Sequence, residues 1–183
     1  SFDRALLPKS SAVRTLSLER DESREADFAR EILGKDAASF DAGGGVMRYS
    51  SDLGSCLIRS GGAVDAVLSR PVEDAEGFCR GLFRSFGYEE VSSSLSGGSG
   101  SVSALRRGKD GPVYNAALTL TFTDGSLTAV FGTFLPALTD GQSASGVDAV
   151  SALVHFLDYC SVSGVVCTEV SAVESGYLLQ SSS

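Results

Sequence analysis

Residues that commonly carry out catalysis are scarce in this chain of 183 residues. His155 is the only histidine, the four cysteines form no CxxC pair, and no GxSxG nucleophile motif occurs. A nucleophilic triad would need His155 beside an activated serine or cysteine and oriented by a carboxylate, for which Asp158 is the geometric candidate. Because such a pair on a helix surface is far more often a solvated contact, we expect no catalytic residues and no enzyme.

Motifs that bind nucleotides or metals are also lacking. Gly43 to Gly45 and Gly97 to Gly100 are not followed by the lysine and helix start of a phosphate loop, so we expect both glycine runs to form turns. The acidic segment 19–31 interleaves three arginines and lacks the oxygen-ligand spacing of a calcium loop. We expect it to be a solvated helix face with ion pairs between residues four apart. No cofactor and no metal are therefore expected.

The four cysteines have neither zinc-ligand spacing nor a histidine nearby in sequence. Cys56 lies in a predicted strand and Cys79 on the apolar stripe of a predicted helix, so we expect both to be small buried hydrophobic residues. Cys160 and Cys167 flank a short loop between a helix end and a strand start. A disulfide between these two is the one pairing left open.

Basic residues are few: 15 Lys and Arg stand against 23 Asp and Glu, which gives a net charge of -8. Such a chain repels phosphate backbones, so nucleic acid is not an expected partner. No apolar run approaches the roughly 20 residues that span a bilayer. Since the chain begins at Ser1 and its single methionine is Met47, we expect a matured or excised fragment, with any signal or membrane anchor preceding Ser1.

Hydrophobic periodicity predicts alternating helices and short strands. Helices are predicted at residues 22–33, 73–86 and 147–157. Strands are predicted at residues 13–20, around Phe40, and at 46–50, 56–59, 63–68, 88–95, 101–107 and 165–179. Gly34 and Gly87 stand where the first two helices should end, and Ser143 or Ser145 is the expected N-cap of the third. Residues 139–145 are expected to form a polar loop.

The stretch 112–138 predicts a central hairpin, because Asp124 and Gly125 tolerate the positive φ of a two-residue turn. That turn pairs Thr123 with Ser126. Continued outward, it pairs Phe122 with Leu127, Leu120 with Ala129, Leu118 with Phe131, and Tyr114 with Leu135. One face of the hairpin is then apolar and needs helices to cover it. The other face, with Thr119, Thr121, Val130 and Phe134, is a candidate contact surface, unless the first half of the chain covers it.

Together these elements predict an α+β fold, with antiparallel sheets and helices packed on one face. Two small subdomains are expected. Residues 1–70 would form a strand, a helix and a meander, and residues 71–183 a helix, four strands, a helix and a final strand.

Five segments carry a family resemblance when taken together and in order: LPKSSAVRTLSLERDESREADFAREILG, GGGVMRYSSDLGSCLIRSGG, FRSFGY, VYNAALTLTFTDGSLTAVFGTFLP and CTEVSAVESGYLLQ. They resemble the YycH/YycI-type two-component-system regulatory proteins of Firmicutes and their clostridial relatives. The resemblance implies an extracytoplasmic domain that a single N-terminal membrane helix anchors and that restrains a sensor histidine kinase. It involves core and turn positions and therefore implies no site residues. Relatives tend to continue past the GY-containing strand, so whether the native chain extends beyond Ser183 is left open.

Three functions are considered on this basis. The leading one is a non-enzymatic extracytoplasmic regulatory module, attached to the cell membrane by a missing N-terminal segment, that modulates a membrane sensor kinase or a related regulator through protein contacts. The second is an inhibitory or propeptide-like domain that binds a protease. The third is a hydrolase built on His155 or on a cysteine.

Overall fold

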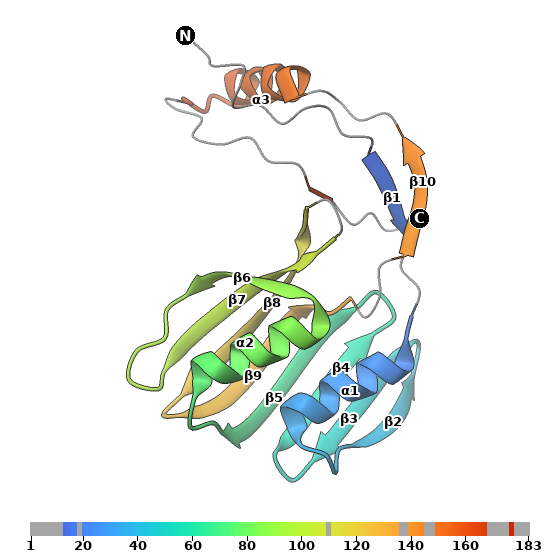
Figure 1. The fold of residues 1–183 in the computed structure, drawn as a ribbon, viewed down its shortest axis with the longest axis vertical. Helices are drawn as coiled ribbons and strands as arrows, with labels where there is room; N and C mark the ends of the chain where they lie inside the picture. Colours follow the sequence, from blue (N-terminus) through green and yellow to red (C-terminus); the bar gives the residue numbers. More distant parts are fainter. Residues whose placement is uncertain are drawn as a thin grey trace. The chain divides into compact units, whose positions relative to one another are not determined.

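The computed structural model describes residues 13–17, 20–108, 111–135, 139–144, 149–167 and 176–177. The chain divides into two compact units. The larger consists of Leu18–Leu138 with Gly176–Ser183, and the smaller of Ser1–Ser17 with Thr139–Ser175. The larger unit has helices and an antiparallel sheet, which confirms the α+β class expected from the sequence (Figure 1).

An eight-stranded antiparallel sheet forms the centre of the larger unit. Its strands are β2 (Ala38–Gly43), β3 (Val46–Ser51), β4 (Gly54–Arg59), β5 (Ala63–Pro71), β6 (Tyr88–Ser93), β7 (Gly100–Arg107), β8 (Pro112–Thr123) and β9 (Ser126–Thr133). They lie in the order β2-β3-β4-β5-β9-β8-β7-β6. Two four-stranded meanders are therefore joined through β5 and β9.

One helix precedes each meander, so the pattern of a helix followed by four strands occurs twice. Helix α1 (Glu22–Leu33) and helix α2 (Ala75–Phe86) both begin after an aspartate N-cap, Asp21 and Asp74, and both end at a glycine with positive φ. Figure 1 shows both helices on the same face of the sheet. The predicted helices and their glycine stops are confirmed, because capping and apolar periodicity are local signals.

The subdomain boundary expected between residues 70 and 71 falls inside β5. This strand pairs with β9 from Ala63 opposite Thr133 to Pro71 opposite Ser126, so the sheet continues across the expected boundary. The two strands are far apart in sequence, and local periodicity does not encode which strands become neighbours. The pairing of β5 with β9 therefore makes one sheet of what the sequence divides into two groups of strands.

Three phenylalanines connect the helices to the sheet. The ring of Phe28 in α1 stacks on Phe134 at 4.3 Å between centroids and meets the edge of Phe86 in α2 at 5.4 Å. Phe134 is fully buried, although the sequence placed it on the polar face of the hairpin. It follows the last residue of β9, so the strand alternation no longer determines its direction.

The β8–β9 hairpin has the predicted turn but not the predicted register. Thr123 pairs with Ser126 and Phe122 with Leu127, as expected, but Leu120 pairs with Val130 and Leu118 with Gly132. The shift arises because Thr128 is an extra residue on β9, and its hydroxyl donates a hydrogen bond to the carbonyl of Thr121 at 3.2 Å. A bulge of this kind reverses the faces of the residues beyond it.

The smaller unit contains β1 (Val13–Ser17), β10 (Thr139–Ala144) and α3 (Ala149–Val162). The expected loop at residues 139–145 is wrong for its first six residues, because they form β10 and pair with β1. Ser143 lies in this strand and cannot cap α3, while Ser145 lies outside the described residues. Of the predicted strand at 165–179, residues 165–167 are not in a strand, and residues 168–175 and 178–179 lie outside the described part. Tyr177 forms an isolated bridge with Val113. None of the helices in the described ranges has the length and apolar character needed to cross a membrane.

Candidate interaction surface

His155 and Asp158 both lie on α3 and are exposed. In the described part of the chain, no hydrogen bond or ion pair joins these two side chains. In the same ranges, no three His, Cys, Asp or Glu side chains come together in a group that could hold a metal ion. The described structure therefore adds no geometry that supports a hydrolase built on His155.

Cys56 and Cys79 are fully buried, as the sequence predicted. Burial raises the pKa of each thiol to about 12. Since the thiolate is the reactive form, both groups are poor nucleophiles at neutral pH. Cys160 is a buried free thiol, so the disulfide left open between Cys160 and Cys167 is not formed.

The acidic segment around α1 differs from the solvated face that we expected. Glu25 is only 2% exposed and accepts hydrogen bonds from Nε and Nη2 of Arg20, which precedes the helix. This contact raises the pKa of the Arg20 guanidinium. The exposed pair within the helix, Arg30 with Asp27, joins residues three apart. The Arg20–Glu25 contact therefore ties the residue before α1 to the beginning of the helix.

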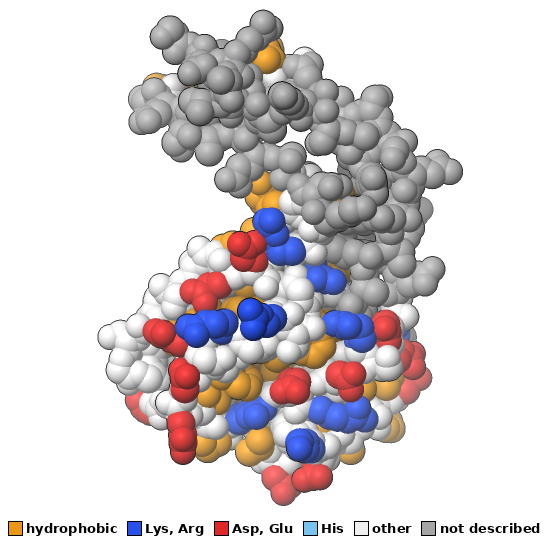
Figure 2. All heavy atoms as spheres, viewed as in Figure 1, with side chains coloured by type: hydrophobic (Ala, Val, Ile, Leu, Met, Phe, Trp, Pro, Cys, Tyr) orange, Lys and Arg blue, Asp and Glu red, His pale blue; other side chains and the backbone are white. Residues whose placement is uncertain are grey.

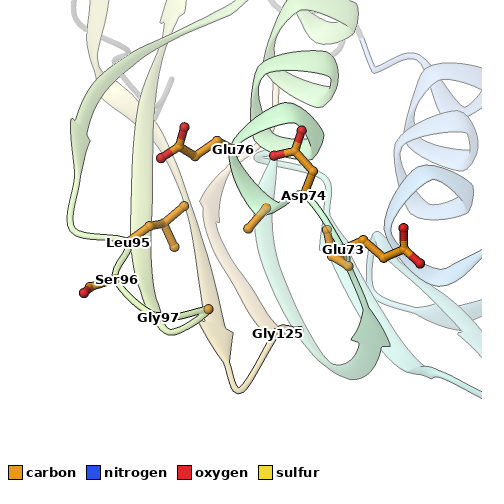
Figure 3. A pocket seen from close by; sticks show the side chains of 10 residues that line it. Glu73, Asp74, Glu76, Leu95, Ser96, Gly97 and Gly125 are labelled. Atoms are coloured by element: carbon orange, nitrogen blue, oxygen red, sulfur yellow. The ribbon is translucent and has the colours of Figure 1, made fainter.

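A surface pocket of about 240 Å³ lies between the start of α2, the β6–β7 turn and Gly125 of the β8–β9 turn (Figure 3). It is lined by three acidic residues, Glu73, Asp74 and Glu76, and by no basic residue. Figure 3 shows these carboxylates pointing in different directions. Asp74 already accepts a hydrogen bond from the backbone N–H of Gly77 at 2.8 Å as the N-cap of α2. The carboxylates thus serve the helix start and do not converge on a ligand.

The two faces of the large sheet differ in composition. Figure 2 shows acidic and basic side chains interspersed over the face that α1 and α2 cover. Core residues of β3, β4 and β5, such as Tyr49, Ile58 and Val64, point toward these helices and are buried. Their neighbours in sequence alternate onto the opposite face, which no helix in the described part of the larger unit covers and which is called the helix-free face below.

The helix-free face exposes large apolar side chains. Phe40 is 67% exposed, Val67 69% and Phe131 50%. The strand register places all three on this face, because Phe40 lies opposite Arg48, Val67 opposite Ser55, and Phe131 opposite Asp65. Val67 and Phe131 lie on the neighbouring strands β5 and β9, and Phe40 lies on β2 at the edge of the sheet. Exposed large apolar side chains that share a sheet face are typical of a surface that contacts another protein.

Strands β7 and β8 add small hydroxyl side chains to the same face. The hydroxyls of Ser103 and Thr119 lie 2.8 Å apart, and Thr119 lies opposite Phe131 across the β8–β9 pair. The sequence placed Thr119 and Thr121 on a candidate contact surface, and both lie on the helix-free face. Its placement of Val130 on that surface is wrong, because Val130 is fully buried. The residue that the sequence missed is Phe131, which the bulge at Thr128 turns to the outside.

Helix α3 is a second exposed apolar surface. Val154 is 50% exposed, Phe156 47% and Tyr159 66%. The helix carries only His155 and Asp158 as ionisable residues other than Tyr159 and Cys160, so it lacks the lysines and arginines of helices that lie on anionic membranes.

No protein-family model, curated protein or solved structure matches this chain.

Proposed function

We propose that this protein is a non-enzymatic, extracytoplasmic regulatory module that acts through protein contacts made by the helix-free sheet face. The observation that carries the proposal is the exposure of Phe40, Val67 and Phe131 on one face of an otherwise well-packed sheet. Burying a large apolar side chain completely contributes about 1.5–3 kcal/mol. Three such side chains, each already partly covered, would contribute several kcal/mol to binding a partner.

The proposed partner is a membrane sensor kinase or a related membrane-anchored regulator. The support for this class is the resemblance of the chain to YycH/YycI-type proteins, in which an outer domain acts on a sensor kinase. A second consideration is charge: the chain has a net charge of -8, which disfavours nucleic acid and anionic membrane surfaces. In this proposal the membrane is reached through an N-terminal anchor and through the partner.

A capture experiment with a matched pair of variants tests the proposal. The 183-residue chain serves as bait in a detergent-solubilised membrane extract of the source organism, and mass spectrometry identifies the captured proteins. Phe131→Asp places a charge on the helix-free face, and Val154→Asp places one on α3 at a residue of equal exposure. Circular dichroism checks that both variants remain folded.

The expected result is capture of a sensor kinase or membrane-anchored regulator that Phe131→Asp abolishes and Val154→Asp preserves. The reverse sensitivity would assign binding to α3 and refute the role of the sheet face. Capture of a protease through Phe131 would instead support the inhibitor function, and capture of nothing above background would overturn the proposal.

A further inference from the structure

Five residues on the helix-free face form a row with a symmetric chemical pattern. Phe40 lies opposite Arg48, Arg48 opposite Leu57, Leu57 opposite Asp65, and Asp65 opposite Phe131. Read across β2, β3, β4, β5 and β9, the row is aromatic, basic, aliphatic, acidic and aromatic. It reads the same from both ends, except that the two charges have opposite signs.

The two charged residues of the row do not pair with each other. Arg48 and Asp65 are both exposed and are separated by β4, which places their backbones roughly 9–10 Å apart. Neither forms an ion pair with another described residue. Each charge is therefore available to a partner that approaches this face.

Two-fold symmetry brings these charges together in only one of two face-to-face arrangements. If the axis runs across the strands above the row, each residue meets its own copy, so that Arg48 faces Arg48 and Asp65 faces Asp65. If the axis runs along β4, Arg48 of one copy faces Asp65 of the other, twice. The second arrangement also places Phe40 against Phe131 and Leu57 against its counterpart.

We propose that the partner of this part of the helix-free face is a second copy of the chain, related by a two-fold axis parallel to β4 and held by two reciprocal pairs of Arg48 and Asp65. Strands of the two sheets then run in nearly the same direction, as in the aligned packing of β-sandwiches, with the sheets about 10 Å apart. A single patch that is complementary to itself is the requirement for an isologous dimer. The inference rests on the proposed use of this face for protein contacts.

The overlap in this dimer is limited to five strands. At about 4.8 Å between strands and about 20 Å along each, they offer roughly 480 Å² of flat area per copy, less than the about 800 Å² of a standard interface. A weak dimer in the micromolar range is therefore expected. Arg59, at the exposed end of β4, meets its own copy at the edge of the interface, where its long side chain can extend into solvent. A second copy and a regulator that binds through Phe131 therefore compete for this residue, while strands β6, β7 and β8 lie outside the overlap and leave their hydroxyl-rich surface accessible.

Charge exchange between Arg48 and Asp65 tests the dimer. Arg48→Asp alone and Asp65→Arg alone each create two like-charge contacts, so sedimentation equilibrium of the full chain should show dimerisation about tenfold weaker or lost. An equimolar mixture of the two single variants should form a heterodimer in which both contacts are again of opposite charge. The double variant Arg48→Asp/Asp65→Arg should dimerise about as well as the unmodified protein. Arg80→Asp, on an exposed position of α2, makes the same change away from this face and should leave the dimer intact.

A chain that stays monomeric at about 500 µM, well above the expected range, would overturn the inference. A dimer that Arg48→Asp and Arg80→Asp weaken equally, or that the mixture of single variants does not restore, would overturn it too. These outcomes are separate from those of the proposed function. A monomer that still captures a membrane regulator through Phe131 would refute only the dimer, whereas a dimer with the expected charge dependence that captures no regulator would refute only the regulatory partner.

Discussion

Replacing Tyr88 by phenylalanine should destabilise the protein by about 2 kcal/mol, because the hydroxyl of Tyr88 joins the start of β6 to the end of β9. This hydroxyl donates to the carbonyl of Thr133 at 2.7 Å and accepts from the N–H of Leu135 at 2.8 Å. Tyr88 is 5% exposed and Leu135 is 2% exposed, so water cannot easily replace the lost bonds. Burial raises the pKa of Tyr88 above its ordinary value, which keeps the hydroxyl a donor at all ordinary pH values.

The magnitude follows from the geometry of this site. Phenylalanine keeps the ring, including its contact with the Arg106 guanidinium 5.7 Å from the centroid, so little apolar packing is lost. Two hydrogen bonds at about 1 kcal/mol each disappear, and the buried N–H of Leu135 and the part-buried carbonyl of Thr133 lose a partner. Because the ring is kept and no cavity forms, the loss stays at about 2 kcal/mol rather than the 3 kcal/mol or more that cavity-forming changes cost.

Urea denaturation followed by circular dichroism measures this effect. With a slope of about 2 kcal/mol per molar urea, the midpoint should fall by about 1 M at unchanged slope. Tyr114→Phe is the matched control, since Tyr114 is 44% exposed on the same sheet, and its midpoint should not move. Equal midpoints for Tyr88→Phe and the unmodified protein would refute the reasoning, because they would mean that the hydroxyl adds no net stability.

Three further predictions concern the stability of the fold and the reactivity of a buried thiol. Gly132→Ala should destabilise the protein by about 3 kcal/mol or more, because φ is +128° and a Cβ there would press on the backbone carbonyl of Ala117. As the control, Gly81→Ala lies in open space on α2 and should stabilise the protein by about 0.5–1 kcal/mol. Peptide mapping after iodoacetamide treatment of the folded protein should show about 1000-fold slower labelling of Cys56 than of an ordinary thiol, because a pKa of about 12 in place of 9.0 lowers the thiolate fraction by that factor; rapid labelling without unfolding would contradict the burial. Hydrogen bonds at the start of α1 lower the pKa of Asp21 below 3.8. The stability that the Asp21 carboxylate contributes is therefore complete above pH 3.8 and is lost as the pH falls through the lower folded-state pKa. Asp21→Asn, which still caps the helix, should show a smaller fall in stability between about pH 5 and pH 2.

The sequence alone predicts the helices, the strands of both meanders and the Asp124-Gly125 turn. Each of these depends on signals within a dozen residues: the aspartate before α1, the glycine after it, and the alternation that marks a strand. The buried state of Cys56 and Cys79 is predictable for the same reason, since each lies on an apolar position of its own element. The absence of a recognisable catalytic motif is likewise a property of the sequence.

The helix-free face is only partly predictable. The sequence indicates that Thr119 and Thr121 share a face, but it places Val130 beside them and puts Phe131 in the core. The bulge at Thr128 reverses these two residues, and its hydrogen bond to Thr121 exists only once β8 and β9 have paired. A shift of one residue in a strand exchanges its faces, so this small local feature determines which aromatic residue is available for contact.

The sequence by itself determined that this protein is an acidic α+β chain with two helix-and-meander groups. Tertiary structure decided that β5 and β9 join these groups into one sheet and that both helices cover the same face. It also decided that Phe40, Arg48, Leu57, Asp65 and Phe131 form one row, although they come from five strands spread over more than half of the larger unit. The physical reason is that helix caps and turns depend on neighbouring residues, whereas the order and register of strands depend on hydrogen bonds between distant segments, which form only when the whole sheet does.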